Sequence, residues 1–226
     1  MKGEDLLLLV APSLARLPWK VIYVGGSVTH LQLSDRTAMA PEGTDDVDIV
    51  VEITSPVVFR VDLAENLRAI GAREDTSEDA PLCRWILKGV TVDVLAPSAV
   101  PLGSTNSWYP LALETALTHI LSDGTELLVI GPVAFVATKL EAFAGRGHGD
   151  CLSSKDVEDI IAVLDGRPEF PAELATANAS VQAFIREGLR ALLANPYFRY
   201  AVDGYLASQP RRAAIVLQRT EDLAQP

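Results

Sequence analysis

A strand with two aspartates near its start is predicted by the sequence TDDVDIVVEI, residues 44–53. The segment is rich in β-branched residues, which favour an extended backbone within a sheet. Side chains alternate between the two faces of a strand, so Asp46 and Asp48 point one way while Val47 and Ile49 point the other way. The strand therefore carries two carboxylates side by side on one face.

Two neighbouring carboxylates repel each other, and a strand gains nothing from them unless a cation lies between them. Carboxylate oxygens are hard ligands of the kind that Mg²⁺ prefers, usually together with the phosphates of a substrate. The alternative is that Asp46 and Asp48 lie at a strand entrance exposed to water, where both are simply solvated. Both interpretations are open on this pattern alone.

A glycine pair precedes this strand, at the point where a predicted strand (21–24) leads into a predicted helix (27–33). Gly25 and Gly26 let the backbone approach a ligand closely, and free N–H groups at the start of a helix favour phosphate. The hydroxyl of Ser27 can add another donor. The alternative is an ordinary turn that connects a strand to a helix.

Asp93 is a charged residue within the apolar sequence GVTVDVL, residues 89–95. A buried carboxylate without a partner is costly, so Asp93 needs a partner or an ion. If this strand lies beside Asp46 and Asp48, the three residues form a three-carboxylate metal cluster. The alternatives are a strand-end aspartate in water and an ion pair with a nearby arginine.

The overall pattern predicts an α/β (α+β) fold with a small mixed β-sheet flanked by helices, followed by a mainly helical C-terminal region. A change of composition separates an expected core at residues 1–105 from a helical region at residues 106–226. Lys88-Gly89 is the expected turn of a hairpin between strands at 83–87 and 90–95. The other predicted elements are helices at 5–17, 61–70 and 132–144, a helix capped by Ser153 or Ser154 that ends at 164, one or two helices within 172–194, and a strand at 126–130.

The 226 residues include 30 acidic and 19 basic side chains, which gives a formal charge of −11. Hydrophobic residues make up 49% and charged residues 22%, values that exclude wholesale disorder. The acidic balance argues against a protein that sheathes nucleic acid, because such proteins usually carry a basic surface. The two cysteines favour a reducing compartment and unmodified thiols, and the alternative is a single disulfide. No apolar run is long enough to cross a bilayer and no signal-type cleavage pattern occurs, so we expect a cytoplasmic protein.

Three motifs occur in order along the chain: Gly-Gly-Ser, then Thr-x-Asp-h-Asp-h, then h-Asp-h-Leu, where h is apolar. This order resembles the nucleotidyltransferase superfamily whose archetype is DNA polymerase β, in which the Gly-Ser turn grips a triphosphate and three carboxylates hold two Mg²⁺ ions. The resemblance implies that the turn at 25–27 binds phosphate and that Asp46 and Asp48 bridge the metals. It also implies that Asp93 ligates the catalytic metal and helps to activate the attacking hydroxyl.

One departure from the family concerns the spacing of these motifs. Eighteen residues separate Ser27 from Asp46, more than in the compact members of the family, and the predicted loop at 35–44 can absorb the excess. Asp45 is a rival for Asp46. The strand-face argument and the Thr-x-Asp-h-Asp pattern both favour Asp46.

The second half carries FVATKLEAF at 135–143, Arg146-Gly147, and SKDVEDI at 154–160. This order is similar to the abortive-infection-type nucleotidyltransferases, which include the toxins of type IV toxin–antitoxin pairs. The resemblance implies that Lys139 contacts the triphosphate and that Asp156 makes a supporting contact with the lysine or the nucleotide. An amine in this apolar helix would favour a nearby anion, and the alternative is a lysine that reaches out to water.

The resemblance covers residues 19–166 and implies a Mg²⁺-dependent nucleotidyltransferase. Such an enzyme moves a nucleoside monophosphate from a nucleoside triphosphate to a hydroxyl acceptor and releases pyrophosphate. The implied acceptor is RNA, in particular the 3′ end of transfer RNA, and an antitoxin protein is a further partner that the resemblance would allow. The alternatives are a small hydroxylated acceptor such as an aminoglycoside, and a non-catalytic nucleotide-binding or interaction module of the same fold.

Overall fold

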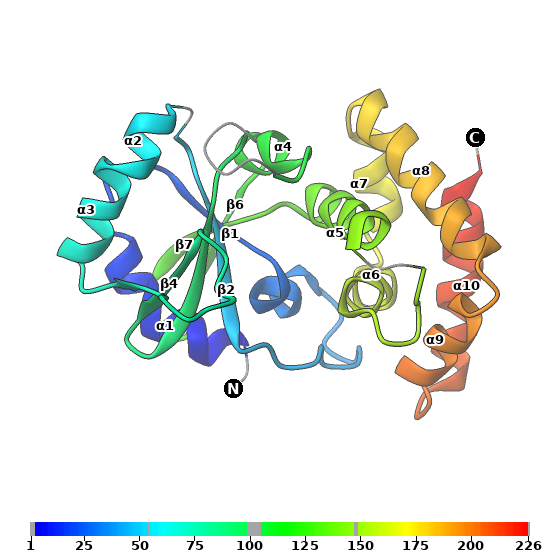
Figure 1. Cartoon of the computed structure of the whole chain (residues 1–226). Helices are drawn as coiled ribbons and strands as arrows, with labels where there is room; N and C mark the ends of the chain where they lie inside the picture. The colour runs from blue at the N-terminus through cyan, green and yellow to red at the C-terminus, as the bar shows by residue number, and fades with distance from the viewer. Residues whose placement is uncertain (1–2, 54, 99–104, 147–148, 226) are drawn as a thin grey trace. The chain divides into compact units, whose positions relative to one another are not determined.

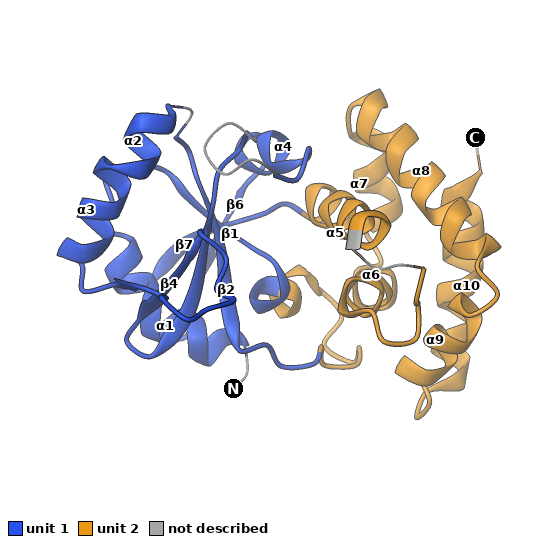
Figure 2. Cartoon of the chain, viewed as in Figure 1, with its two compact units in different colours: residues 1–28, 42–131 blue, residues 29–41, 132–226 orange. Residues whose placement is uncertain are grey.

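The computed structural model describes residues 3–53, 55–98, 105–146 and 149–225, without the side chain of Arg146. The chain forms two compact units, coloured separately in Figure 2. The sheet unit comprises residues 1–28 and 42–131, and the helical unit comprises residues 29–41 and 132–226. Strands and helices make up the first unit, and helices are the regular elements described after Gly131, so the expected α+β class with a mainly helical C-terminal region is confirmed.

The strands of the sheet unit form one mixed sheet (Figure 1). Within the described residues it has seven strands in the order β3-β4-β5-β2-β1-β7-β6. The pairs β2–β5 and β1–β7 are parallel, whereas β1 and β2 are antiparallel. The strands are β1 (Val21–Val24), β2 (Asp46–Val51), β3 (Arg73–Glu74), β4 (Arg84–Leu87), β5 (Val90–Leu95), β6 (Leu117–Ile120) and β7 (Glu126–Val129).

Alternation along the central strands produces one strongly apolar face. Val47, Ile49 and Val92 are each at most 1% exposed, as expected for side chains that point into a core. The first helix, α1 (Gly3–Leu14), contacts β2 and β5 and ends three residues before the predicted position. The other helices of this unit are α2 (Pro56–Arg60), α3 (Asp62–Ala69) and α4 (Tyr109–Glu114).

The boundary between the units lies at Gly131, whereas the sequence predicted a division at residue 105. Strand β7 pairs in parallel with β1, and β6 pairs with β7, so both strands belong to the same sheet as the N-terminal strands. The predicted strand at 126–130 therefore completes the sheet instead of belonging to the helical region. Strand β6 was not predicted, because its side chains are mostly exposed and lack an apolar alternation.

The segment after Gly25 forms the 3₁₀ helix η1 (Gly26–Gln32), within which the chain passes from the sheet unit into the helical unit. The following loop at 33–41 accounts for the long spacing between Ser27 and Asp46. The backbone N–H groups of Ser34 and Asp35 both donate to the carbonyl of Gly166 at 2.9 Å. The loop is therefore fixed to the C-terminal end of a helix in the helical unit.

In that unit, Arg212 joins the loop to the helix that ends at Gly166, because it pairs with one carboxylate from each. Its Nη2 donates to Asp35 at 2.9 Å, and its Nε donates to Asp165 at 2.6 Å. Hydrogen bonds from Thr37 are the main reason that the pKa of Asp35 falls to about 2, and Arg212 adds to the effect. The excess residues that the sequence placed in a loop are thus an ordered part of the helical unit.

Six helices form the rest of the described helical unit, and their caps follow from the sequence. Ser154 accepts a hydrogen bond from the N–H of Val157 and begins α6, as one of the two predicted caps, and Asn178 caps α8 in the same way. A Cβ at Gly188 would lie 2.8 Å from a methyl carbon of Leu140, so glycine permits close packing there. The helices are α5 (Pro132–Arg146), α6 (Lys155–Gly166), α7 (Phe170–Thr176), α8 (Ala179–Ala194), α9 (Phe198–Tyr205) and α10 (Pro210–Ala224).

A helix must be long and apolar to cross a bilayer, and none of the helices in the described parts of the chain is both.

Candidate metal centre

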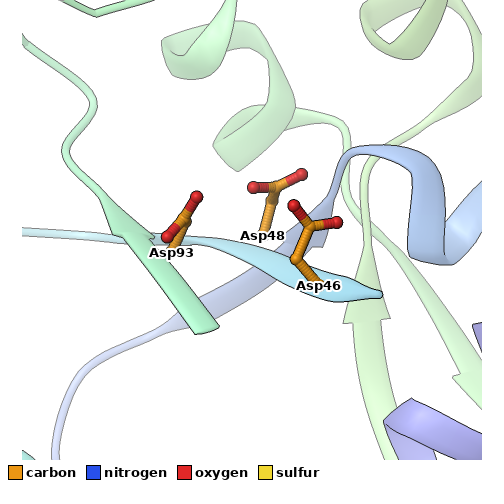
Figure 3. A group of neighbouring side chains, drawn as sticks. All are labelled: Asp46, Asp48 and Asp93. Atoms are coloured by element: carbon orange, nitrogen blue, oxygen red, sulfur yellow. The ribbon is translucent and has the colours of Figure 1, made fainter. Parts of the chain in front are cut away.

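Asp46, Asp48 and Asp93 converge in the sheet unit (Figure 3). In the parallel register of β2 and β5, Asp48 lies opposite Asp93, and Asp46 lies two residues before Asp48 on the same face of β2. One carboxylate oxygen from each of the three residues lies within 4.8 Å of the others. The condition set by the sequence, that the Asp93 strand lies beside β2, is therefore met. The three residues form a group that could hold a metal ion.

Gly25 is what allows the Asp48 carboxylate to occupy its position. Val24 pairs with Asp48 in the antiparallel register of β1 and β2, and the next residue, Gly25, has a φ of +69°. A Cβ built on Gly25 would lie 1.8 Å from Oδ2 of Asp48. No side chain fits in this space, so the turn and the carboxylate require glycine for two independent reasons. The carboxylate oxygens that this turn admits are donors of the kind that hold hard divalent cations.

Of the two rival residues Asp45 and Asp46, the one that joins the convergent carboxylates is Asp46. Asp45 is exposed and is not among the three convergent carboxylates. Asp46 is half-buried, and its Oδ1 accepts a hydrogen bond from the hydroxyl of Thr44 at 2.5 Å. Thr44, the first residue of the Thr-x-Asp-h-Asp motif, therefore orients the first carboxylate.

Ser27 lies close to the same turn but directs its hydroxyl elsewhere. The residue is 1% exposed, and Oγ donates to the carbonyl of Val24 at 3.5 Å. Gly26 begins η1, so the backbone of the turn has the expected arrangement of a strand followed by a helix. The phosphate contact of the Ser27 hydroxyl stays a prediction.

Arg84 is a residue of this group that the sequence did not single out. It lies on β4 directly opposite Asp93. Its Nε donates to Oδ1 of Asp93 at 2.8 Å, and its Nη2 donates to Oδ2 at 2.7 Å. These hydrogen bonds are the main reason that the pKa of Arg84 is raised. The sequence left two interpretations of Asp93 open, a cluster with Asp46 and Asp48 or an ion pair with an arginine. The structure contains both arrangements.

A signal for Arg84 was present in the predicted hairpin. Lys88 and Gly89 have positive φ angles of 51° and 82°, which is the geometry of a two-residue type I′ turn. Such a turn pairs residue 87 with residue 90, and counting outward from this pair places Arg84 opposite Asp93. The partner of Asp93 could therefore have been found from the turn alone.

Cys83 precedes Arg84 and is half-buried. Burial raises the pKa of its thiol, and the Asp93 carboxylate adds to that shift. The side chain therefore stays protonated around neutral pH. Both Cys83 and Cys151 are free, in agreement with the prediction from sequence.

Lys139 and Asp156 lie in the helical unit, where a third residue joins them. Nζ of Lys139 lies 3.3 Å from Oδ1 of Asp156 and 2.5 Å from Oδ2 of Asp159. The hydroxyl of Thr29 donates to the other oxygen of Asp159 at 2.8 Å. The expectation that this buried amine pairs with an anion is confirmed, and the anions are two aspartates of α6. The Arg146 side chain and Gly147, which belong to the same sequence pattern, lie outside the described residues.

The sequence matches no family model, and a search of curated proteins finds no significant match. Neither comparison therefore indicates a function for the chain, and the sequence motifs and the geometry of the three carboxylates are what bear on it.

Proposed function

We propose that the protein is a Mg²⁺-dependent nucleotidyltransferase, which moves a nucleoside monophosphate from a nucleoside triphosphate to a hydroxyl group and releases pyrophosphate. The observation that carries the proposal is the convergence of Asp46, Asp48 and Asp93 beside the glycine turn at Gly25. Two bound Mg²⁺ ions would neutralise the triphosphate and stabilise the entering and leaving oxygens.

The contribution of the protein itself would be positioning and charge. Asp46 and Asp48 would hold the ions from β2, and Asp93 would hold an ion from β5 and help to activate the acceptor hydroxyl. Backbone N–H groups of the turn at 25–27 would face the phosphates. Lys139 and Asp156 are left out of this proposal, because the ammonium of Lys139 already pairs with two aspartates of its own unit, Asp156 and Asp159.

The acceptor class can be narrowed by the charge of the sheet unit. This unit has 17 acidic and 8 basic residues, a formal charge of −9, whereas the helical unit has 13 and 11, a formal charge of −2. A strongly acidic surface attracts cations and repels a polyanion. The charge therefore supports a small cationic acceptor with hydroxyl groups, of the aminoglycoside kind, over a long RNA.

The experiment that tests the proposal follows label from each α-labelled nucleoside triphosphate, with Mg²⁺, into total RNA or into a panel of aminoglycosides. We expect label to enter one acceptor and pyrophosphate to appear in equal amount. Asp48→Asn should reduce the rate by roughly 100-fold or more, because metal ions contribute several kcal/mol of transition-state stabilisation.

Asp45→Asn is the matched control, since it removes the same charge from an exposed neighbour outside the carboxylate group. It should keep full activity, and circular dichroism should show that both variants are folded. Full activity of Asp48→Asn would rule out the proposal. A thermal-shift response to a nucleoside triphosphate without any transfer would favour the alternative of a nucleotide-binding module.

A further inference from the structure

Asp93 accepts hydrogen bonds from a guanidinium at both of its carboxylate oxygens. The two hydrogen bonds from Arg84, at 2.8 and 2.7 Å, form a bidentate pair, the strongest and most directional kind that a carboxylate makes with a side chain. The side chain of Arg84 is 30% exposed and that of Asp93 is 13% exposed. The pair is therefore shielded from water on most of its surface, so its charges are only partly screened.

The register of the sheet fixes this pair in place. Arg84 and Asp93 are directly opposite each other on β4 and β5, and Asp93 is directly opposite Asp48 on β2. A row of three residues thus runs across three neighbouring strands, with the guanidinium at one end and Asp48 at the other. The orientation of the Asp93 carboxylate follows from the row, because the planar fork of Arg84 leaves it little freedom.

The charges of this row and of Asp46 sum to −2, since three carboxylates face one guanidinium. One divalent cation neutralises that charge. A guanidinium in contact with a ligand lowers the affinity of the ligand for any other cation, as it does for a proton. Each carboxylate oxygen still has a second lone pair, so Arg84 weakens metal binding at Asp93 without excluding it.

We propose that Arg84 is a positioning residue that serves as the internal counter-ion of the three carboxylates and weakens divalent-cation binding before nucleotide arrives. The proposal rests on the metal site of the proposed function and concerns its regulation. Arg84 holds Asp93 toward Asp48 while its charge stands in for part of a metal ion. The full complement of divalent cations is then favoured only when the negative charge of a triphosphate is added.

The test is a Mn²⁺ titration of the full chain without nucleotide, with free Mn²⁺ measured by electron paramagnetic resonance. A charge within about 4–6 Å changes proton affinity by one to three pK units, so Arg84→Gln should bind Mn²⁺ at least about tenfold more tightly than the wild type. Arg84→Lys keeps the charge and should stay within about threefold of the wild type. Arg73→Gln is the control for net charge, because Arg73 is exposed on β3.

The outcomes separate this inference from the proposed function. If neither the wild type nor Arg84→Gln binds Mn²⁺, or if Asp48→Asn binds it as tightly as the wild type, the metal site itself is overturned. If the wild type binds Mn²⁺ and Asp48→Asn does not, but Arg84→Gln binds with equal or lower affinity, only the role of Arg84 is overturned. A residue with a merely structural role would lower the melting temperature when replaced without tightening Mn²⁺ binding.

A second measurement uses the wild type and does not depend on the folding of a variant. The Nε–H resonance of Arg84 should shift during a Mg²⁺ titration, because a cation at Asp93 weakens the hydrogen bond from Nε to Oδ1. The midpoint of this shift should equal the dissociation constant for Mg²⁺ measured by calorimetry. A resonance that does not move while Mg²⁺ binds would overturn the proposal.

Discussion

In the helical unit two carboxylates converge on a lysine, whereas in the sheet unit three carboxylates converge and an arginine pairs with one of them. The ammonium of Lys139 lies within 3.3 Å of both Asp156 and Asp159, and all three side chains are at most 13% exposed. In the sheet unit, Arg84 contacts Asp93 on one side, and Asp48 lies opposite Asp93 on the other side. A basic side chain and several aspartates thus form two different electrostatic arrangements.

The difference shows what a carboxylate cluster needs in order to remain available to a ligand. In the helical unit one ammonium lies between two carboxylates, so the three charges sum to −1, and the main effect of this buried cluster is on stability. In the sheet unit the guanidinium pairs with Asp93 at one end of the row, and the charges of Arg84 and the three aspartates sum to −2. This more negative group of side chains favours a divalent cation more than the lysine cluster does.

The largest effect that would break this comparison is expected from Lys139→Met. Removing the ammonium leaves two buried carboxylates, which should lower the free energy of unfolding by about 3–5 kcal/mol. Urea denaturation followed by circular dichroism measures the change. Lys155→Met is the control, because Lys155 is exposed on α6 and its replacement should have little effect. Unchanged stability of Lys139→Met combined with loss of a nucleotide response would instead support the triphosphate contact that the family resemblance implies.

A smaller effect on stability, with a specific effect on the metal site, is expected from Gly25→Ala. The positive φ alone costs about 1–3 kcal/mol for a residue with a side chain, and the new Cβ would displace Asp48. Mn²⁺ affinity should therefore fall together with stability. Gly71→Ala separates the two causes, since Gly71 has a φ of +92° with no atom within 4 Å of its Cβ position. Equal loss of Mn²⁺ affinity in both variants would contradict the role of Gly25.

The smallest expected effect concerns the ionisation of Asp35 in the helical unit, and it depends on pH. The pKa of Asp35 is about 2 in the folded protein, mainly because Thr37 donates hydrogen bonds to it. The unfolded value is near 4, so the ionised group stabilises the fold above about pH 4, and this contribution is lost as the pH falls toward 2. Melting temperatures of the wild type and Asp35→Asn should therefore differ at pH 7 and converge near pH 2. Asp203→Asn, at an exposed position, should follow the wild type throughout.

Local patterns in the sequence predicted the parts of the fold and of the site that depend on nearby residues. Alternation predicted the acidic face of β2, and the Lys88-Gly89 turn predicted the hairpin of β4 and β5. Ser154 was one of two predicted caps because a serine before an apolar helix is a common start signal. These features depend on neighbours within a few residues, so a single sequence contains the necessary information.

Pairings between distant strands could not be predicted in this way. The meeting of Asp48 and Asp93 depends on the parallel pairing of β2 and β5, which no turn specifies. The boundary at residue 105 was predicted because the composition changes there, although β7 returns to pair with β1. The contact between Lys139 and Asp159 was not predicted either, because it joins two different helices, α5 and α6.

The parallel pairing of β1 with β7 also constrains how the protein can be synthesised and folded. Ile22 pairs with Leu128, so β1 leaves the ribosome about 100 residues before its neighbour is available. The segment at 29–41 similarly precedes the helices of its own unit. Contacts of such long sequence separation form slowly, and a nascent chain that stops at residue 105 exposes an unpaired edge of β1. Each unit is made of two separate segments of the chain. A fragment of the chain is therefore expected to aggregate under conditions in which the whole chain folds.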